Sequence, residues 1–118
     1  MKNAVEMILT GNLYKTGFRF YAQQKGIELG ITGTIGYYGE YGDVLIFAEG
    51  EAEALKAYTD WCAKGMPYCK VDEVHIKIVP PLDYRSFDII TSSPEFVETE
   101  NAEVLPKMKS LRLRIFGF

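Results

Sequence analysis

AVEMILTGNLYKTGFR, residues 4–19, joins a strand pattern to the beginning of a helix. Apolar side chains alternate along residues 4–11, which predicts a largely buried strand there. A loop follows, and Gly17 then leads into a helix that Gly30 is suited to end. The predicted buried face of this helix consists of Phe18, Tyr21, Ala22 and Leu29.

The chain continues with two more strands and a second helix. Residues 31–37 and 43–49 predict strands that are joined by a turn rich in Gly and Tyr at 38–42. The second helix is expected to open at Gly50-Glu51-Ala52-Glu53 and to end at Gly65-Met66-Pro67. Its predicted core-facing residues are Leu55, Tyr58, Trp61 and Cys62.

Two further strands are predicted at 71–79 and 85–90. In the first of them, alternate residues face opposite ways, so that one face is in contact with water. The apolar row is Val74, Ile76 and Ile78, and the solvent-facing row is Glu73, His75 and Lys77.

The order of these elements is β-α-β-β-α-β followed by a short added strand. This is the order of the ferredoxin-like split βαβ fold, an α+β sandwich in which two helices cover one face of an antiparallel sheet. We therefore predict one domain at residues 1–90. The fold alone does not give the function, because enzymes, metal carriers, RNA-binding proteins and ligand sensors share it.

The C-terminal extension, residues 91–118, has a different composition. Thr91-Ser92-Ser93-Pro94 is typical of a linker, residues 95–103 are acidic, and residues 107–118 are basic. Apolar and basic side chains alternate near the end, at Leu111, Arg112, Leu113, Arg114 and Ile115. This alternation favours a sixth strand on a sheet edge over a mobile tail.

Composition excludes several classes of function. A formal net charge of -3 disfavours nucleic-acid binding, which needs a clustered basic surface. No apolar run approaches the roughly 20 residues of a membrane helix, and the N-terminal residues lack the apolar core of an export signal. We therefore expect a cytoplasmic protein without nucleic-acid or membrane partners. No sequence feature sets an oligomeric state.

Cys62, Cys69 and His75 are the residues outside the first loop that suggest chemistry. Without an export signal, the cysteines are expected to be reduced thiols. A metal site would need more ligands than one histidine and two cysteines, and a Cys–His nucleophilic pair would need a third, orienting group. We predict structural roles for all three residues, and no metal or other cofactor.

The loop between the first strand and the first helix has the features of an anion-binding site. Backbone N–H groups without partners cluster at a helix N-terminus, where the helix dipole adds partial positive charge. Arg19 can hold two oxygens of a phosphate or carboxylate, and Lys15 adds a second charge. The alternative is a plain loop with two solvated cations. The predicted phosphate contacts come from Tyr14, Lys15, Thr16, Gly17, Phe18 and Arg19.

This loop resembles the phosphate-binding signature of the acylphosphatases, Gly-x-Val-Gln-Gly-Val-Gly-Phe-Arg. Gly11, Gly17, Phe18 and Arg19 match it, and Leu13 is a mild change from Val. The resemblance extends in order over residues 4–90. Further matches are Glu28-Leu29-Gly30-Ile31-Thr32-Gly33, Ala48-Glu49-Gly50, Ala54-Leu55, Trp61, Val71-Asp72-Glu73-Val74 and Phe87-Asp88-Ile89.

The resemblance implies hydrolysis of the carboxyl–phosphate bond of small acyl phosphates, without a metal or a covalent intermediate. Arg19 and the loop N–H groups would hold the phosphate and offset its charge in the transition state. In this family an asparagine on the second strand positions the attacking water. That position falls on Tyr37 here, and Asn12, the nearest asparagine, matches a different family position.

Three of the departures from the family pattern bear directly on the predicted site. The Tyr37 phenol is longer than a carboxamide and cannot donate and accept through separate atoms. Tyr14 replaces a glutamine. Lys15 replaces a glycine, and a lysine adopts a positive φ less readily.

Two functions follow from these features. One is an acylphosphatase with Arg19 and Tyr37 as its catalytic residues and with weakened turnover, acting on small acyl phosphates. The alternative is a catalytically degenerate domain that binds inorganic phosphate, a carboxylate or a protein partner, for which Tyr37, Tyr38 and Tyr41 would provide contact surface. An RNA-binding sheet is disfavoured by the charge.

Overall fold

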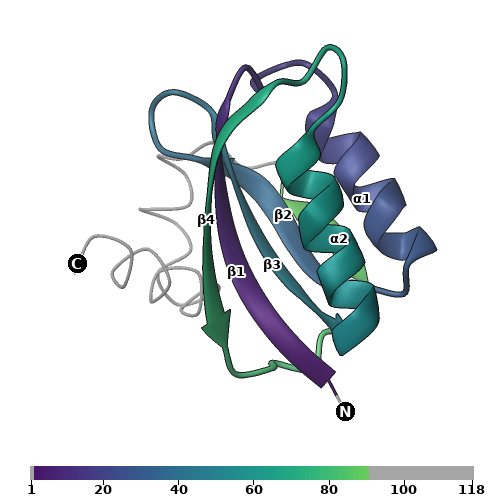
Figure 1. The fold of residues 1–118 in the computed structure, drawn as a ribbon. Helices are drawn as coiled ribbons and strands as arrows, with labels where there is room; N and C mark the ends of the chain where they lie inside the picture. The colour runs from purple at the N-terminus through teal and green to yellow at the C-terminus, as the bar shows by residue number, and fades with distance from the viewer. Residues whose placement is uncertain (1, 91–118) are drawn as a thin grey trace.

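Strand β1 (Lys2–Gly11) lies inside the sheet of the computed structural model, which describes residues 2–90 (Figure 1). It pairs antiparallel with β3 (Asp43–Glu51) and with β4 (Val71–Val79). β2 (Thr32–Tyr38) pairs antiparallel with β3. β5 (Phe87–Ile90) adds to β2 in parallel, which gives the order β4-β1-β3-β2-β5.

Helices α1 (Phe18–Glu28) and α2 (Ala52–Lys64) both cover the same face of this sheet (Figure 1). The predicted ferredoxin-like sandwich is thereby confirmed. Among the strands of residues 2–90, β2 and β5 are the one pair that is not antiparallel. Among residues 2–90, neither helix is long and apolar enough to span a membrane.

The main core fills the space between the sheet and the two helices. Alternate residues of β1 and β3 face it, because side chains along a strand point to opposite faces. The Tyr58 hydroxyl on α2 donates a hydrogen bond to the carbonyl of Ala22 on α1, at 2.9 Å, and so joins the two helices. The largest contributors are Met7, Leu9, Ile46, Phe18, Leu55, Tyr58 and Cys62.

The close packing of α1 on β5 depends on Gly26. A Cβ atom at this position would lie 2.1 Å from the Phe87 ring. Gly26 is buried together with Phe18 and Ala22 on the same face of the helix. Tyr21, which was expected on that face, is instead exposed and packs edge-on against Phe20, with ring centroids 5.8 Å apart. The buried face is therefore a narrow stripe of every fourth residue.

Two other expectations need correction. β3 continues through Glu51 and α2 begins at Ala52, so Gly50 lies within the strand, and Glu51 both ends the strand and forms the N-cap of the helix. Ile76 and Ile78 do lie on the helix side, because they pair with Met7 and Val5, but they are 49% and 84% exposed. β4 is an edge strand, and the core packs only against its first half, at Val71 and Val74.

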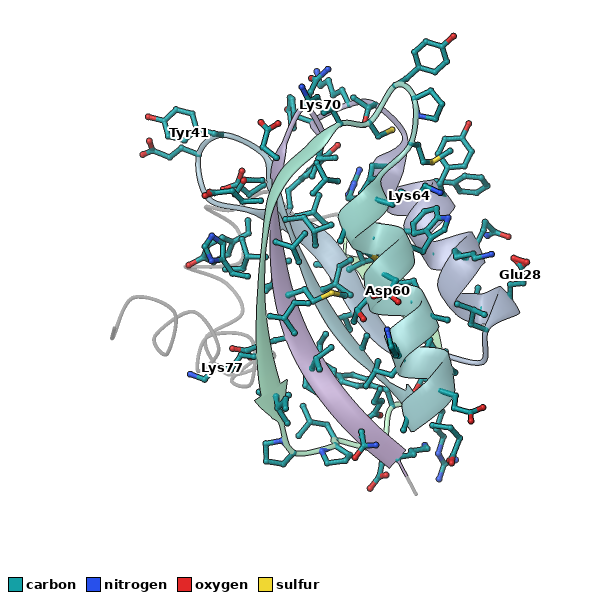
Figure 2. All side chains as sticks on the ribbon, in the orientation of Figure 1. Glu28, Tyr41, Asp60, Lys64, Lys70 and Lys77 are labelled. Carbon is teal, nitrogen blue, oxygen red and sulfur yellow. The ribbon has the colours of Figure 1, made fainter. Side chains whose placement is uncertain are left out.

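The opposite row of β4 lies on the face away from the helices, as predicted. Glu73 and His75 are exposed there, and Lys77 projects away from the helix layer (Figure 2). The strand predicted at residues 111–116 lies outside the described residues.

The buried thiol of Cys62 predicts a loss of stability in alkali. Burial raises the pKa of Cys62 to about 12 and also raises the pKa of Tyr58. Above the ordinary thiol pKa of about 8.5, the unfolded chain loses a proton that the folded chain keeps, so rising pH favours unfolding. The effect is at most about 1.4 kcal/mol per pH unit and per group. We expect the urea concentration at the midpoint of unfolding to be lower at pH 9.5 than at pH 8.

The matched variant is Cys62→Ala, which removes this titrating group. It should be less stable than the wild type at both pH values because it leaves a cavity, and its midpoint should change less with pH. Equal pH slopes for the two proteins would contradict the assignment to Cys62.

Candidate functional site

The loop from Gly11 to Gly17 is held in shape by its own backbone. Leu13 is fully buried, and its carbonyl accepts hydrogen bonds from the N–H and the hydroxyl of Thr16, at 3.3 and 2.7 Å. Asn12 donates its N–H to the carbonyl of Lys70 at 2.9 Å. The N–H and the hydroxyl of Thr16, a residue that the sequence assigned to the phosphate, therefore both donate within the loop.

Helix α1 begins directly after this loop without a side-chain cap. Gly17, the residue before the helix, has a φ of 86°, and Tyr21 donates the first helical hydrogen bond to its carbonyl. Within residues 2–90, no hydrogen bond is donated by the backbone N–H groups of Gly17 and Phe18. Such N–H groups at the positive end of a helix attract an anion. The Phe18 side chain itself is buried in the core.

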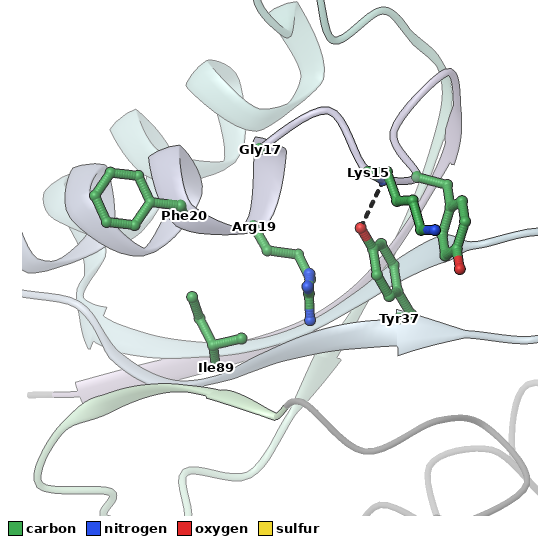
Figure 3. A pocket seen from close by; sticks show the side chains of 7 residues that line it. Lys15, Gly17, Arg19, Phe20, Tyr37 and Ile89 are labelled. Atoms are coloured by element: carbon green, nitrogen blue, oxygen red, sulfur yellow. Dashed lines mark hydrogen bonds between the residues drawn. The ribbon is translucent and has the colours of Figure 1, made fainter.

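Tyr37, at the end of β2, lies directly against this loop (Figure 3). Its hydroxyl accepts a hydrogen bond from the backbone N–H of Lys15 at 2.8 Å. The Arg19 guanidinium lies over the Tyr37 ring, 4.0 Å from its centroid, in cation–π geometry. The Tyr14 ring is 4.9 Å from the same ring, tilted by 50°. Tyr37 thus contacts three of the six residues that the sequence assigned to the phosphate, namely Tyr14, Lys15 and Arg19.

Lys15 has a φ of 57°. This is the left-handed backbone region that glycine adopts without strain and that costs other residues roughly 1–2 kcal/mol. The sequence indicates that a lysine adopts such a positive φ less readily than the glycine of the family pattern. The structure keeps the left-handed turn with the lysine in place, and the hydrogen bond from its N–H to Tyr37 accompanies that conformation.

A cavity of about 330 Å³ opens between the loop, the first turn of α1 and the ends of β2 and β5 (Figure 3). Two cations and two exposed aromatic rings, Tyr14 and Phe20, lie around it. Arg19 also donates a weak hydrogen bond from Nη1 to the carbonyl of Ile90 at 3.4 Å. The lining residues are Tyr14, Lys15, Gly17, Arg19, Phe20, Tyr37 and Ile89.

The β2–β3 turn supports one wall of this cavity through Gly42. The Tyr14 side chain packs on this glycine so closely that a Cβ atom there would lie 2.7 Å from the Tyr14 Cβ, and its φ is 76°. Any other residue at this position would be strained and would displace Tyr14. The glycine of the turn therefore positions a site residue from outside the loop.

Five of the seven predicted site residues line the cavity, namely Tyr14, Lys15, Gly17, Arg19 and Tyr37. Sequence reasoning missed Phe20 and Ile89. Phe20 could have been found, because Phe18 and Phe20 lie on different sides of a helix and only one can enter the core. The place of Ile89 in the cavity follows from the parallel pairing of β5 with β2, where Ile89 lies opposite Ile35. No local sequence pattern predicts that pairing.

The other candidates lie elsewhere. Asn12 is exposed and does not line the cavity. Cys62 and Cys69 are buried free thiols, whereas His75 is exposed on the sheet face away from the helices, so no Cys–His pair forms. Among residues 2–90, no three His, Cys, Asp or Glu side chains are grouped as metal ligands.

The three tyrosines considered as a contact surface also diverge. Tyr37 lines the cavity, and the next residue, Tyr38, packs with Ile8 and Leu45 on the other sheet face. Tyr41 projects from the β2–β3 turn into solvent (Figure 2). They do not form one surface.

Comparisons with known proteins agree with this fold. The family model described as Acylphosphatase matches residues 5–89. The chain is 36% identical over 78 residues to an acylphosphatase of Marinobacter nauticus, covering 66% of this chain and 84% of that protein. It is similar to the structure of an acylphosphatase from Coxiella burnetii, with a TM-score of 0.71 and 26% identity over 75% of this chain and 93% of the other. For the Bacillus subtilis acylphosphatase the TM-score is 0.70, with 25% identity over 76% and 99% of the two chains. The chain therefore belongs to the acylphosphatase family.

Proposed function

We propose that this protein hydrolyses small acyl phosphates in the cavity beside Tyr37, without a metal ion and with slow turnover. The observation that carries the proposal is the convergence of Arg19, Lys15 and the unbonded N–H groups of Gly17 and Phe18 on one side of the fold. These groups supply positive charge and N–H donors together, which is what a phosphate requires. Family membership supports the same chemistry.

The phosphate end of the substrate binds at the start of α1. The N–H groups of Gly17 and Phe18 donate to its oxygens, and Arg19 provides a charge-assisted contact. As water attacks phosphorus and the bond to the acyl oxygen breaks, negative charge shifts over these oxygens, and the same donors stabilise it. The products are inorganic phosphate and a carboxylate. The carboxylate is a good leaving group, so no general acid is needed.

Tyr37 is the group that orients the attacking water in this proposal. Its oxygen already accepts the N–H of Lys15, which leaves its own proton and one lone pair for a water or a phosphate oxygen. The arrangement also occupies an N–H that would otherwise serve the phosphate. The reaction is therefore slower than in a site with a carboxamide for two reasons. The phenol has fewer groups left to orient water, and the Lys15 N–H is not available to the phosphate.

The decisive experiment is hydrolysis of benzoyl phosphate by the purified full chain, with metal chelator present. We expect measurable turnover and competitive inhibition by inorganic phosphate. Arg19→Ala should weaken phosphate binding by about tenfold or more, because removing a charge-assisted hydrogen bond costs roughly 1.5–3 kcal/mol. Calorimetric titration with phosphate measures this change.

The matched control is Arg85→Ala, which removes the same charge from an exposed site outside the cavity. It should leave phosphate binding unchanged. If both variants lost phosphate affinity equally, the loss would come from the change in net charge, and Arg19 would not be a phosphate contact.

A binding domain without turnover is the alternative that one observation favours. The hydrogen bond from the Lys15 N–H to Tyr37 fills part of the anion-binding loop with a group of the protein itself. Saturable phosphate binding with no hydrolysis above the rate in buffer would support this alternative and overturn the enzymatic proposal.

A further inference from the structure

The sheet face away from the helices carries a small apolar patch formed by Ile8 of β1 and Leu45 of β3. These two residues pair across the strands, and Tyr38 and Ile90 pack against them. The side chains of Ile8 and Leu45 are 8% and 3% exposed, respectively. Neither helix covers them, since both helices lie on the opposite face (Figure 1).

The segment that connects β4 to β5 does not cover this patch either. It packs through Leu82 and Tyr84 on a separate cluster formed by Ala4, Phe47 and Val79. Beside the patch, a cavity of about 680 Å³ opens over β1 and β4, with Glu6, Asp43, His75 and Lys77 among its lining residues. Within residues 2–90, Tyr38 and Ile90 are the hydrophobic side chains packed against the buried Ile8 and Leu45, and neither a helix nor the β4–β5 connection lies over them.

We propose that the basic C-terminal stretch, residues 107–118, docks on this face and covers Ile8 and Leu45. The occupant is a segment of the same chain because the chain leaves the described domain at this place. Ile90, the last residue of β5, is itself one of the side chains packed against the patch. The 16 residues from 91 to 106 can span up to about 50 Å when extended, which exceeds the length of any strand here.

Charge supports the same occupant. Residues 107–118 contain four basic side chains and no acidic one, whereas residues 1–90 contain three more acidic than basic side chains. Glu6 and Asp43 lie beside the patch. Burial raises the pKa of Asp43, and a basic neighbour would favour its charged form.

The residue pattern fits a sheet face. Leu111, Leu113 and Ile115 share one side of an extended segment, and Arg112 and Arg114 share the other. The apolar row can cover Ile8 and Leu45 while both arginines reach acids or water. The alternation that suggested an added edge strand is met equally well by a segment that lies on this face.

The docked segment also connects to the anion site. The Ile90 side chain packs on the patch, and its backbone carbonyl accepts the hydrogen bond from Arg19. A segment that covers the patch would therefore contact Ile90, whose carbonyl accepts the hydrogen bond from Arg19. Docking does not depend on the proposed hydrolysis, and it can be tested without an assay.

The test uses a spin label on the full chain at Ser110→Cys. The two native thiols are buried, so the new cysteine is the selective target in the folded protein. We expect the label to abolish the methyl signals of Ile8 and Leu45 in NMR spectra and to leave that of Leu55, on the helix side, nearly intact. Equal weak broadening of all three signals would overturn the proposal.

Two controls distinguish other occupants. Leu113→Asp in the labelled chain should restore the Ile8 and Leu45 signals, whereas Val97→Asp, the same change in the acidic stretch, should not. In a mixture of spin-labelled chains and isotope-labelled chains without spin label, the signals should remain. Their loss in the mixture would show that the segment docks on a second copy, which overturns the intramolecular proposal.

Discussion

Replacing Tyr37 by asparagine is expected to raise kcat/KM on benzoyl phosphate by about 10-fold to 100-fold. A single positioning or oxyanion contact is typically worth about 10²–10³ in rate, and only part of this is recovered when the surrounding site is unchanged. The expectation rests on the proposed hydrolysis. It predicts a gain of function, which few substitutions in a folded site produce.

Two changes contribute to the expected gain. The hydroxyl of Tyr37 is removed from the N–H of Lys15, which then becomes available to a phosphate oxygen. The shorter carboxamide leaves room for a water and offers a donor and an acceptor on separate atoms. One change opposes them, because Arg19 loses the ring on which it lies at 4.0 Å.

Tyr37→Phe separates these contributions. It frees the Lys15 N–H, keeps the ring beneath Arg19 and supplies no group that orients water. We expect phosphate to bind about threefold to tenfold more tightly, as one gained hydrogen bond predicts, while kcat stays at or below the wild-type value. Steady-state kinetics and phosphate titration of the three proteins measure both effects.

This account would be wrong if the wild type had the same kcat/KM on benzoyl phosphate as Tyr37→Asn. Tyr37 would then orient water as well as a carboxamide does, and the chain would be an efficient acylphosphatase with an altered residue. Loss of activity in both Tyr37→Asn and Tyr37→Phe would also show that the Tyr37 hydroxyl orients water adequately.

The fold could be predicted from the sequence because its elements follow local rules. Alternation along residues 4–11 and the apolar stripe of α2 depend on the period of each element alone, and both are found as expected. The exposure of Ile76 and Ile78 could not be predicted this way. It depends on how far α2 extends over an edge strand, which is a property of the packed layers.

The candidate site likewise has one part that local sequence predicts and one part that it does not. Lys15, Gly17 and Arg19 lie next to one another in the chain at a helix start, so local reasoning brought them together. The contact of Tyr37 with the loop joins residues 22 positions apart, and the contact of Arg19 with Ile90 joins residues 71 positions apart. The family pattern indicated the place of Tyr37, but neither the pattern nor the residue spacing indicates that its hydroxyl accepts a loop N–H.

Glu49 is the residue whose role the sequence concealed most fully. It was noted only as part of a matching Ala48-Glu49-Gly50, yet it is a fully buried carboxylate on β3. Its oxygens accept the backbone N–H groups of Leu82, at 2.8 Å, of Asp83, at 3.2 Å, and of Tyr84. Burial and the nearby charge of Glu49 raise the pKa of the Tyr84 phenol.

These hydrogen bonds hold the segment that carries the chain from β4, at one edge of the sheet, to β5 at the other edge. The segment has no regular secondary structure, so its N–H groups find partners in the carboxylate instead of in a neighbouring strand. β5 supplies Ile89 to the cavity and the carbonyl of Ile90 to Arg19. Glu49 thus positions part of the cavity wall beside Arg19 from a distance.

We therefore expect Glu49→Ala to lower the free energy of unfolding by about 3–5 kcal/mol. Each N–H left without an acceptor costs about 1–3 kcal/mol, and the three together reach this range when water replaces some of the lost bonds. A small domain has a total stability of only about 5–15 kcal/mol, so the variant is expected to be partly unfolded at 37 °C.

Glu49→Gln retains the shape of the side chain but replaces one acceptor oxygen by an NH₂ group that faces N–H donors. It should lose about 2–4 kcal/mol, most of the effect of the alanine variant. Glu40→Gln makes the same chemical change in the exposed β2–β3 turn and should lie within about 0.5 kcal/mol of the wild type. Urea unfolding of the full chain measures all three. If Glu49→Gln were as stable as Glu40→Gln, the carboxylate would not be what fastens the β4–β5 connection, and the position of Ile90 beside Arg19 would need another cause.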